Sequence, residues 1–230
     1  MELTKERKKQ LSDFCNRVGI SFKNYELLDQ AFHHRSLTNE QRGVKNNERL
    51  EFLGDSVLGM VTASYLYKNL DNPEGDLAKI KSAVVSEKAL APIALNFKID
   101  SILVLGHGEE ISGGRQKPAI LADCMEAIIG ALYLDSGYKA AESYVLSFII
   151  PAVNEILSQG LKDYKTQLQE VFQKKTKKCP RYELISKSGP DHNQTFKVVV
   201  HLEDKTFGPA SAKTKKEAEQ LAAKLALQSL

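Results

Sequence analysis

The chain has 230 residues, enough for one large or two modest domains, and its 42% hydrophobic and 27% charged residues are ordinary for a soluble globular protein. It has no run of about 18 uninterrupted apolar residues, and no apolar stretch follows its charged N-terminus, so we expect neither a transmembrane helix nor a secretory signal. Cys15, Cys124 and Cys179 are widely spaced, which fits reduced thiols and excludes a paired-cysteine zinc motif.

The charge is unevenly distributed along the chain. Residues 161–230 contain 14 Lys and Arg against 8 Asp and Glu, a net charge of +6, whereas residues 1–160 carry −3. A basic C-terminal part favours a polyanionic partner. A solvated lysine-rich surface has the same composition, so charge alone leaves both interpretations open.

Residues 1–157 have the pattern of successive helices. Apolar residues recur at helical spacing in 11–20, 48–67, 76–97, 118–134 and 138–157, separated by turn-forming stretches such as NPEGD and GHGEEISGG. Pro73 suits the first turn of the helix that follows it. The pattern predicts an all-α domain.

Two of these predicted helices carry acids among apolar residues. In NNERLEFLGD, Glu48, Glu51 and Asp55 fall on one side of the helix, and no Lys or Arg four residues further on balances them. The opposite side is apolar and contains Leu50, Leu53, Val57, Met60 and Val61. In KPAILADCMEAIIGALYLD, Asp123 and Glu126 likewise share one face.

The two acidic faces predict a metal site if they meet. Gly59 and Gly130 each follow an acid at i+4, and small residues there let two helices approach closely. Converging carboxylates repel one another unless a cation holds them or some take up protons. Oxygen ligands without histidine favour Mg²⁺ or Mn²⁺. Solvated surface acids remain the alternative, and a di-iron bundle is disfavoured because no Glu-x-x-His occurs.

The hydrophobic pattern of the sequence changes near Gly160. A helix is predicted over 163–175, strands over RYELISKSG and TFKVVVHLED, and a third strand over KTFGPASA. The last helix begins near Thr214, which forms a capping box with Glu217. The order α-β-β-β-α predicts a small α+β domain, a sheet covered by two helices.

The motifs together resemble a known family. NNERLEFLGDSVLG is similar to the signature helix of ribonuclease III, the double-stranded-RNA endonuclease, and the likeness extends through HHRSL, EGDLAKIKSAVVSE and the stretch from GHGEEISGG to LDSGY. The C-terminal residues resemble a double-stranded-RNA-binding domain. The resemblance implies a catalytic domain over 1–157, a linker over 158–162 and an RNA-binding domain over 163–230.

The sequence departs from the family pattern at two places. Asn46 stands where the signature commonly has His, and we expect little effect on the chemistry because this residue precedes the acids. Ala210, Ser211 and Ala212 replace a frequent Gly-x-Gly, which affects the loop before the last helix rather than the helix itself.

The resemblance implies a metal-dependent hydrolysis that needs no protein nucleophile. The products are 5′-phosphate and 3′-hydroxyl ends with short 3′ overhangs. Mg²⁺ is the expected cofactor, with Mn²⁺ as a substitute and no small-molecule cofactor. Family members act as homodimers in which each subunit cuts one strand, and Phe52 matches an aromatic that packs into the partner; a contact within the subunit is its alternative. The metal-site acids are Glu48, Glu51, Asp55, Asp123 and Glu126, of which Asp55 and Glu126 form the predicted catalytic set and Glu51 has a supporting or metal-linked role.

RNA binding is expected in the C-terminal domain. On its first helix one polar face lies opposite Leu168, Val171 and Phe172, and polar groups there can meet ribose 2′-hydroxyls across a minor groove. Lysines crowd the start of the last helix, where they oppose the helix dipole unless a phosphate binds between them. By resemblance, a loop histidine enters a neighbouring minor groove. The predicted RNA-binding residues are Thr166, Gln169, Glu170, Gln173, His192, Lys213, Lys215 and Lys216.

Other residues have weaker signals. His33 and His34 are interpreted as structural packing around the signature helix, and Gly113, Gly114 and Arg115 either approach RNA or form a simple turn. The resemblance implies a cytoplasmic enzyme of ribosomal-RNA and messenger-RNA processing without a membrane partner. The alternative function is a non-catalytic double-stranded-RNA-binding protein that keeps the same fold.

Overall fold

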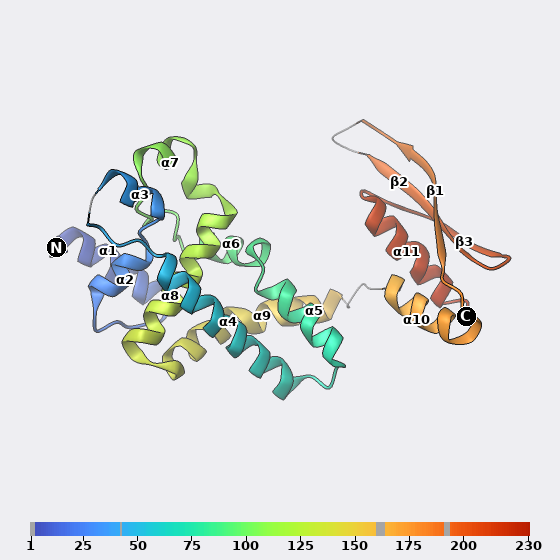
Figure 1. Cartoon of the computed structure of the whole chain (residues 1–230), viewed down its shortest axis with the longest axis horizontal. Coiled ribbons are helices and arrows are strands. Elements are labelled where there is room, and N and C mark those ends of the chain that lie inside the picture. Colours follow the sequence, from blue (N-terminus) through green and yellow to red (C-terminus); the bar gives the residue numbers. More distant parts are fainter. Residues whose placement is uncertain (1–2, 42, 160–163, 191–193) are drawn as a thin grey trace. The chain divides into compact units, whose positions relative to one another are not determined.

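The computed structural model describes residues 3–41, 43–159, 164–190 and 194–230. The chain forms two compact units, Met1–Ser158 and Gln159–Leu230 (Figure 1). The first unit is helical and the second combines helices with a sheet, so the predicted pairing of an all-α domain with a small α+β domain is confirmed.

The helices of the first unit follow the predicted pattern in its long segments. The predicted helix over 76–97 is wrong in one respect, because it consists of two helices that meet at Ser86, whose hydroxyl accepts from the Ala89 amide and starts the second one. Pro73 occupies the N-cap position of the first of these two helices, which begins at Glu74, rather than lying inside its first turn. The elements are α1 (Lys5–Val18), α2 (Tyr25–Ala31), α3 (Arg35–Glu40), α4 (Glu48–Asn69), α5 (Glu74–Val84), α6 (Glu87–Asn96), α7 (His107–Ile111), the 3-10 helix η1 (Gly114–Gln116), α8 (Pro118–Ser136) and α9 (Tyr138–Gln159).

Helices α4 and α8 cross in close contact in this unit. A Cβ atom added to Gly54 would lie 1.7 Å from the carbonyl oxygen of Glu126, and one added to Gly130 would lie 2.2 Å from that of Leu50. The crossing therefore requires glycine at both positions. The role assigned to Gly59 is wrong, since the nearest atom to a Cβ there is the Lys81 Nζ at 3.6 Å.

The apolar side of α4 packs into the core as predicted at Leu50, Val57 and Val61, whereas Met60 is exposed.

Helix α9 is long and apolar enough to cross a membrane by length and composition alone. Its buried side chains recur at helical spacing and belong to the core, as expected for a core helix of a globular domain; they are Ala141, Tyr144, Val145, Phe148, Ile149 and Val153.

The second unit is a three-stranded antiparallel sheet with two helices. The elements are α10 (Tyr164–Thr176), β1 (Arg181–Ser188), β2 (Thr195–Leu202), β3 (Lys205–Ala212) and α11 (Lys215–Leu227), and the strands lie in the order β1-β2-β3 (Figure 1). Thr214 accepts a hydrogen bond from the Glu217 amide and starts α11 as predicted. Alternate residues of β2 face a core completed by the small side chains of α11, namely Val198, Val200, Leu202, Ala218, Ala222 and Ala226.

Candidate functional site

A polar cavity of about 660 Å³ opens beside the N-terminal part of α4. The walls come from α3, α4, α7, α8 and the segments before α4 and α8. They include Arg35, Asn46, Glu109, Lys117 and three of the predicted metal ligands, Glu48, Glu51 and Asp123. Glu48 of α4 and Asp123 of α8, 75 positions apart in the sequence, therefore share one cavity because the two helices cross at their glycines.

The predicted metal acids differ in burial. Glu51, Asp123 and Glu126 are half-buried, whereas Glu48 and Asp55 are exposed. Burial, followed by the charges of Asp55, Asp123 and Glu51, raises the pKa of Glu126 to about 8. The acids of the two helices are thus electrostatic neighbours across the crossing.

The pKa values of two other acids are raised for related reasons. Burial, and then the charge of Asp123, raises the pKa of Glu51. Burial, and then the charge of Glu87 at the start of α6, raises the pKa of Asp123. Burying several ionised carboxylates together costs free energy, so the folded protein holds a proton on these groups more tightly than free carboxyl groups do when no cation is bound.

A basic residue from another helix partly offsets this repulsion. The Arg35 Nη1 atom lies 3.7 Å from Oε1 of Glu48, and its positive charge opposes part of the rise in the pKa values of Glu51 and Asp123. The spacing along α4 could not reveal this cation, because it belongs to α3. The Arg35 side chain is exposed, so the pair with Glu48 contributes about 1 kcal/mol or less by itself.

The chemistry of the donors fits a hard divalent cation, although the carboxylates do not form a closed set. Among the described residues, no three His, Cys, Asp or Glu side chains stand close enough together to hold a metal ion. The Glu48 carboxylate is turned toward Asn46 and Arg35. Half-buried, all-oxygen donors that repel one another have the chemistry that suits Mg²⁺ or Mn²⁺.

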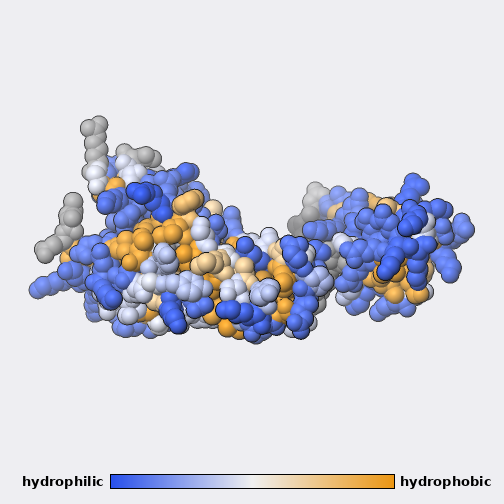
Figure 2. Space-filling model, turned by 60° about the horizontal axis from the view of Figure 1, so that its bottom comes forward, coloured by the Kyte–Doolittle hydropathy of each residue, from blue (hydrophilic) through white to orange (hydrophobic). Residues whose placement is uncertain are grey.

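Phe52 does not pack into the core of the first unit. Its side chain is 78% exposed, so the alternative of an intramolecular core contact is wrong. It lies at an apolar hollow of about 920 Å³ whose wall includes Leu27, Val44, Leu53 and Leu134. Figure 2 shows hydrophobic residues gathered on one face of this unit.

The weaker candidates on the first unit have structural roles. The His34 ring accepts from the Ser36 amide and caps α3, and His33 contacts Asp29 and the Lys45 carbonyl. Arg115 donates to the carbonyls of Asp100 and Leu103, which favours the simple turn over an RNA contact for the 113–115 loop.

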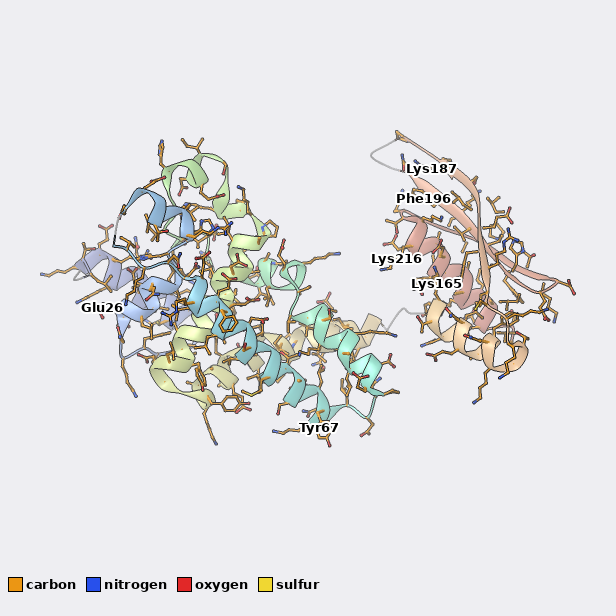
Figure 3. All side chains as sticks on the ribbon, viewed as in Figure 1. Glu26, Tyr67, Lys165, Lys187, Phe196 and Lys216 are labelled. Atoms are coloured by element: carbon orange, nitrogen blue, oxygen red, sulfur yellow. The ribbon has the colours of Figure 1, made fainter. Side chains whose placement is uncertain are left out.

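The predicted RNA-binding residues of the second unit lie on its surface. On α10, Gln169, Glu170 and Gln173 are exposed and Thr166 is half-buried, but Val171 is 38% exposed and therefore not on the core face as predicted. At the start of α11, Lys213, Lys215 and Lys216 are exposed. His192 lies outside the described residues. Figure 3 shows Lys216 on α11, and Lys187 on β1 beside Phe196 on β2, with the Lys187 Nζ 5.7 Å from the ring centre.

Comparison with known proteins places both units. Residues 24–153 match the family described as Ribonuclease-III-like, and residues 164–230 match the double-stranded RNA binding motif. Ribonuclease 3 of Treponema denticola is 54% identical over 99% of this chain and 94% of its own length, and that of Treponema pallidum is 48% identical over 99% and 92%.

A solved structure gives the same result for the first unit. The nuclease domain of ribonuclease III from Campylobacter jejuni is 38% identical, with a TM-score of 0.57 over 62% of this chain and 97% of that domain. The description of that structure refers to flexibility in a region involved in dimer formation. The chain therefore belongs to the ribonuclease III family of nucleases and carries a double-stranded-RNA-binding motif in its C-terminal part.

Proposed function

We propose that the chain is an endonuclease that hydrolyses phosphodiester bonds in double-stranded RNA with Mg²⁺, for which Mn²⁺ can substitute. The products are 5′-phosphate and 3′-hydroxyl ends with short 3′ overhangs. The observation that carries the proposal is the crossing of α4 and α8 at Gly54 and Gly130, which makes half-buried acids of both helices electrostatic neighbours. A cation between them relieves their repulsion.

The ion is held by Glu48, Glu51, Asp55, Asp123 and Glu126, with Asp55 and Glu126 acting directly in catalysis. When bound, a divalent ion supplies an acidic water as nucleophile near neutral pH and neutralises charge on the phosphate. The chain itself presents the carboxylates, of which Glu126 must lose the proton that its raised pKa favours. Arg35 lines the same cavity and offers positive charge to the RNA backbone, and Lys117 lies there paired with Glu109.

The C-terminal unit holds the duplex in this proposal. The exposed polar face of α10, with Gln169 and Gln173, meets ribose hydroxyls in a minor groove, and Thr166 and Glu170 border it. Lys213, Lys215 and Lys216 meet phosphates at the start of α11, where backbone N–H groups also point outward. His192 remains a proposed contact by resemblance.

The active form is a homodimer. Phe52 and the apolar hollow beside it lie on one surface, so a two-fold axis would insert each Phe52 into the partner and bury both. Two such subunits present two acidic sites, one for each strand of a duplex.

The cellular role follows the family. We assign residues 1–157 to the catalytic domain, 158–162 to the linker and 163–230 to the RNA-binding domain; the linker lies largely outside the described residues. Processing of ribosomal-RNA precursors and messenger RNA in the cytoplasm is the expected role, without a membrane partner or small-molecule cofactor.

A cleavage assay tests the function. A long end-labelled RNA duplex is incubated with the full chain in Mg²⁺, in Ca²⁺ and in EDTA, and the products are separated on a gel. We expect discrete short products with Mg²⁺ and only a shifted complex with Ca²⁺ or EDTA. A shifted but intact duplex in both Mg²⁺ and Mn²⁺ would identify a non-catalytic RNA-binding protein instead.

A further inference from the structure

Asn46 contacts one of the proposed metal ligands directly. Its Nδ2 donates to Oε2 of Glu48 at 2.9 Å, and the Glu48 amide donates to Oδ1 of Asn46 at 3.3 Å. Because Asn46 precedes α4, its side chain folds over the first turn and fixes the direction of the Glu48 carboxylate. This contact motivates a different hypothesis from the expectation that the residue at position 46 has little effect.

The segment that carries Asn46 is tied to the end of α2. Gln30 Nε2 donates to the Asn46 carbonyl at 2.9 Å, and the Asn47 amide donates to the His33 carbonyl at 2.9 Å. The Asn47 side chain is only 3% exposed and donates to the Ala31 carbonyl at 3.2 Å. Four hydrogen-bonding groups thus fix the backbone just before Glu48 to one short stretch of chain.

A mostly buried cluster of Arg7, Asp29 and His33 contacts the end of α2 and the residues that follow it. Asp29 is 8% exposed and pairs with Arg7 of α1 at 2.6 Å and with His33 at 3.1 Å. Burial alone would raise the pKa of Asp29, but the hydrogen bonds from His33 and Arg7 outweigh it and lower the pKa. Arg7 also donates to the Ile102 carbonyl and stands over the Phe32 ring.

The contacts form a continuous path from α1 to the acidic cavity. Arg7 fixes Asp29, Asp29 fixes His33, and the ring and carbonyl of His33 fix Lys45 and Asn47 on either side of Asn46. Groups that orient a metal ligand commonly change metal affinity about 10–100-fold when they are removed.

We propose that Asn46 is a positioning residue for Glu48, and that the Arg7–Asp29–His33 cluster acts on the metal site through the segment that carries Asn46. This inference rests on the proposed metal role of Glu48. The amide of Asn46 is a neutral donor that does not itself titrate, so it holds the Glu48 carboxylate by a hydrogen bond without adding a charge to the site.

Metal binding without RNA tests the role of Asn46. The full chain, stripped with EDTA, is titrated with Mg²⁺ by calorimetry as wild type, N46A, N46D and E48Q. We expect N46A to weaken Mg²⁺ binding about tenfold, and N46D to weaken it as well because an Asp side chain cannot donate to Glu48. N69A is the matched control, since Asn69 caps the far end of α4 through the Tyr65 carbonyl, and it should bind like wild type.

The outcomes separate the two proposals. If E48Q weakens binding while N46A and N46D bind Mg²⁺ like wild type, Asn46 has no positioning role and the metal site stands. If E48Q also binds like wild type, or wild type binds no Mg²⁺, the proposed metal role of Glu48 fails and the inference fails with it.

A double-mutant cycle tests the path from Arg7. R7Q should weaken Mg²⁺ binding several-fold, with R7K recovering part of the loss, and R7Q should add little when Asn46 is already Ala. Helical circular dichroism and the melting temperature confirm that each variant is folded. Independent, additive effects of R7Q and N46A on Mg²⁺ affinity would contradict the proposed path, even if both variants bind the ion less tightly.

Discussion

The two units place their charged residues in opposite ways. In the nuclease unit, Glu51, Asp123 and Glu126 are half-buried around a helix crossing, and burial raises their pKa values. In the RNA-binding unit, Lys213, Lys215 and Lys216 are exposed, and the surface is largely hydrophilic (Figure 2). A site that does chemistry needs charges fixed and partly desolvated, whereas a surface that holds a long polyanion needs charges accessible to phosphate.

Removing the RNA-binding unit has the largest expected effect of the changes that test this comparison. A chain ending at residue 159 keeps the acidic crossing and loses the basic unit. We expect its affinity for duplex RNA to fall roughly 100-fold at physiological salt, because the phosphate contacts are gone, while cleavage stays detectable at low salt. Gel shifts and cleavage rates across a salt series measure both, and a truncated chain that is folded yet wholly inactive at low salt would contradict the division.

The helix crossing can be broken by one methyl group. In G130A the new Cβ meets the Leu50 carbonyl, so we expect a loss of about 3 kcal/mol in the free energy of unfolding, at the upper end for overpacking. G59A is the matched control on α4, where there is room, and helix propensity predicts a gain of up to about 1 kcal/mol. Urea titration measures the free energy of unfolding of both variants. Equal changes in G130A and G59A would show that the close contact between α4 and α8 does not lie at Gly130.

Replacing the lysines at the start of α11 tests whether the exposed charges of the second unit serve binding alone. Replacing Lys213, Lys215 and Lys216 by Gln should weaken duplex binding about tenfold at moderate salt and flatten the dependence of log affinity on log salt. Cleavage at saturating RNA should keep its wild-type rate. A changed maximal cleavage rate with unchanged affinity for duplex RNA would show that these lysines act in catalysis rather than in binding.

The acids also predict a pH effect on metal-free stability. The pKa of Glu126 is raised from 4.5 to about 8, so the folded state binds the proton more tightly than the unfolded chain does. The contribution of Glu126 to stability in EDTA is therefore fully present below the lower value and is lost as the pH rises through the upper one. At pH 8, E126Q should melt roughly 3 °C above wild type in EDTA, and at pH 5 the difference should vanish. A higher melting temperature of wild type at pH 8 would reverse the assigned sign.

Much of this architecture could be predicted from sequence because long periodic helices and alternating strands carry strong local signals. The strands over 181–188, 195–202 and 205–212 follow their apolar alternation and turn residues closely. The short helices α2, α3 and α7 were not predicted, since 5 to 7 residues are too few to show a period.

The parts of the site that were missed depend on the partner helix. Gly59 and Gly54 are both glycines on α4, and only the packing of α8 decides that Gly54 lies at the crossing. Arg35 and Asn46 belong to segments before α4, so no spacing rule within a helix connects them to Glu48. Residue type and helical period therefore predict the acids, whereas only the tertiary contacts show that Arg35 and Asn46 lie beside Glu48.

The most direct test of the metal-site account is single-turnover cleavage by E126A at saturating duplex RNA and Mg²⁺. The account predicts a rate at least about 1,000-fold below that of wild type, with duplex affinity in Ca²⁺ unchanged because the RNA-binding unit is intact. Cleavage by E126A at the wild-type rate would show that the half-buried acids of α4 and α8 are not the catalytic centre.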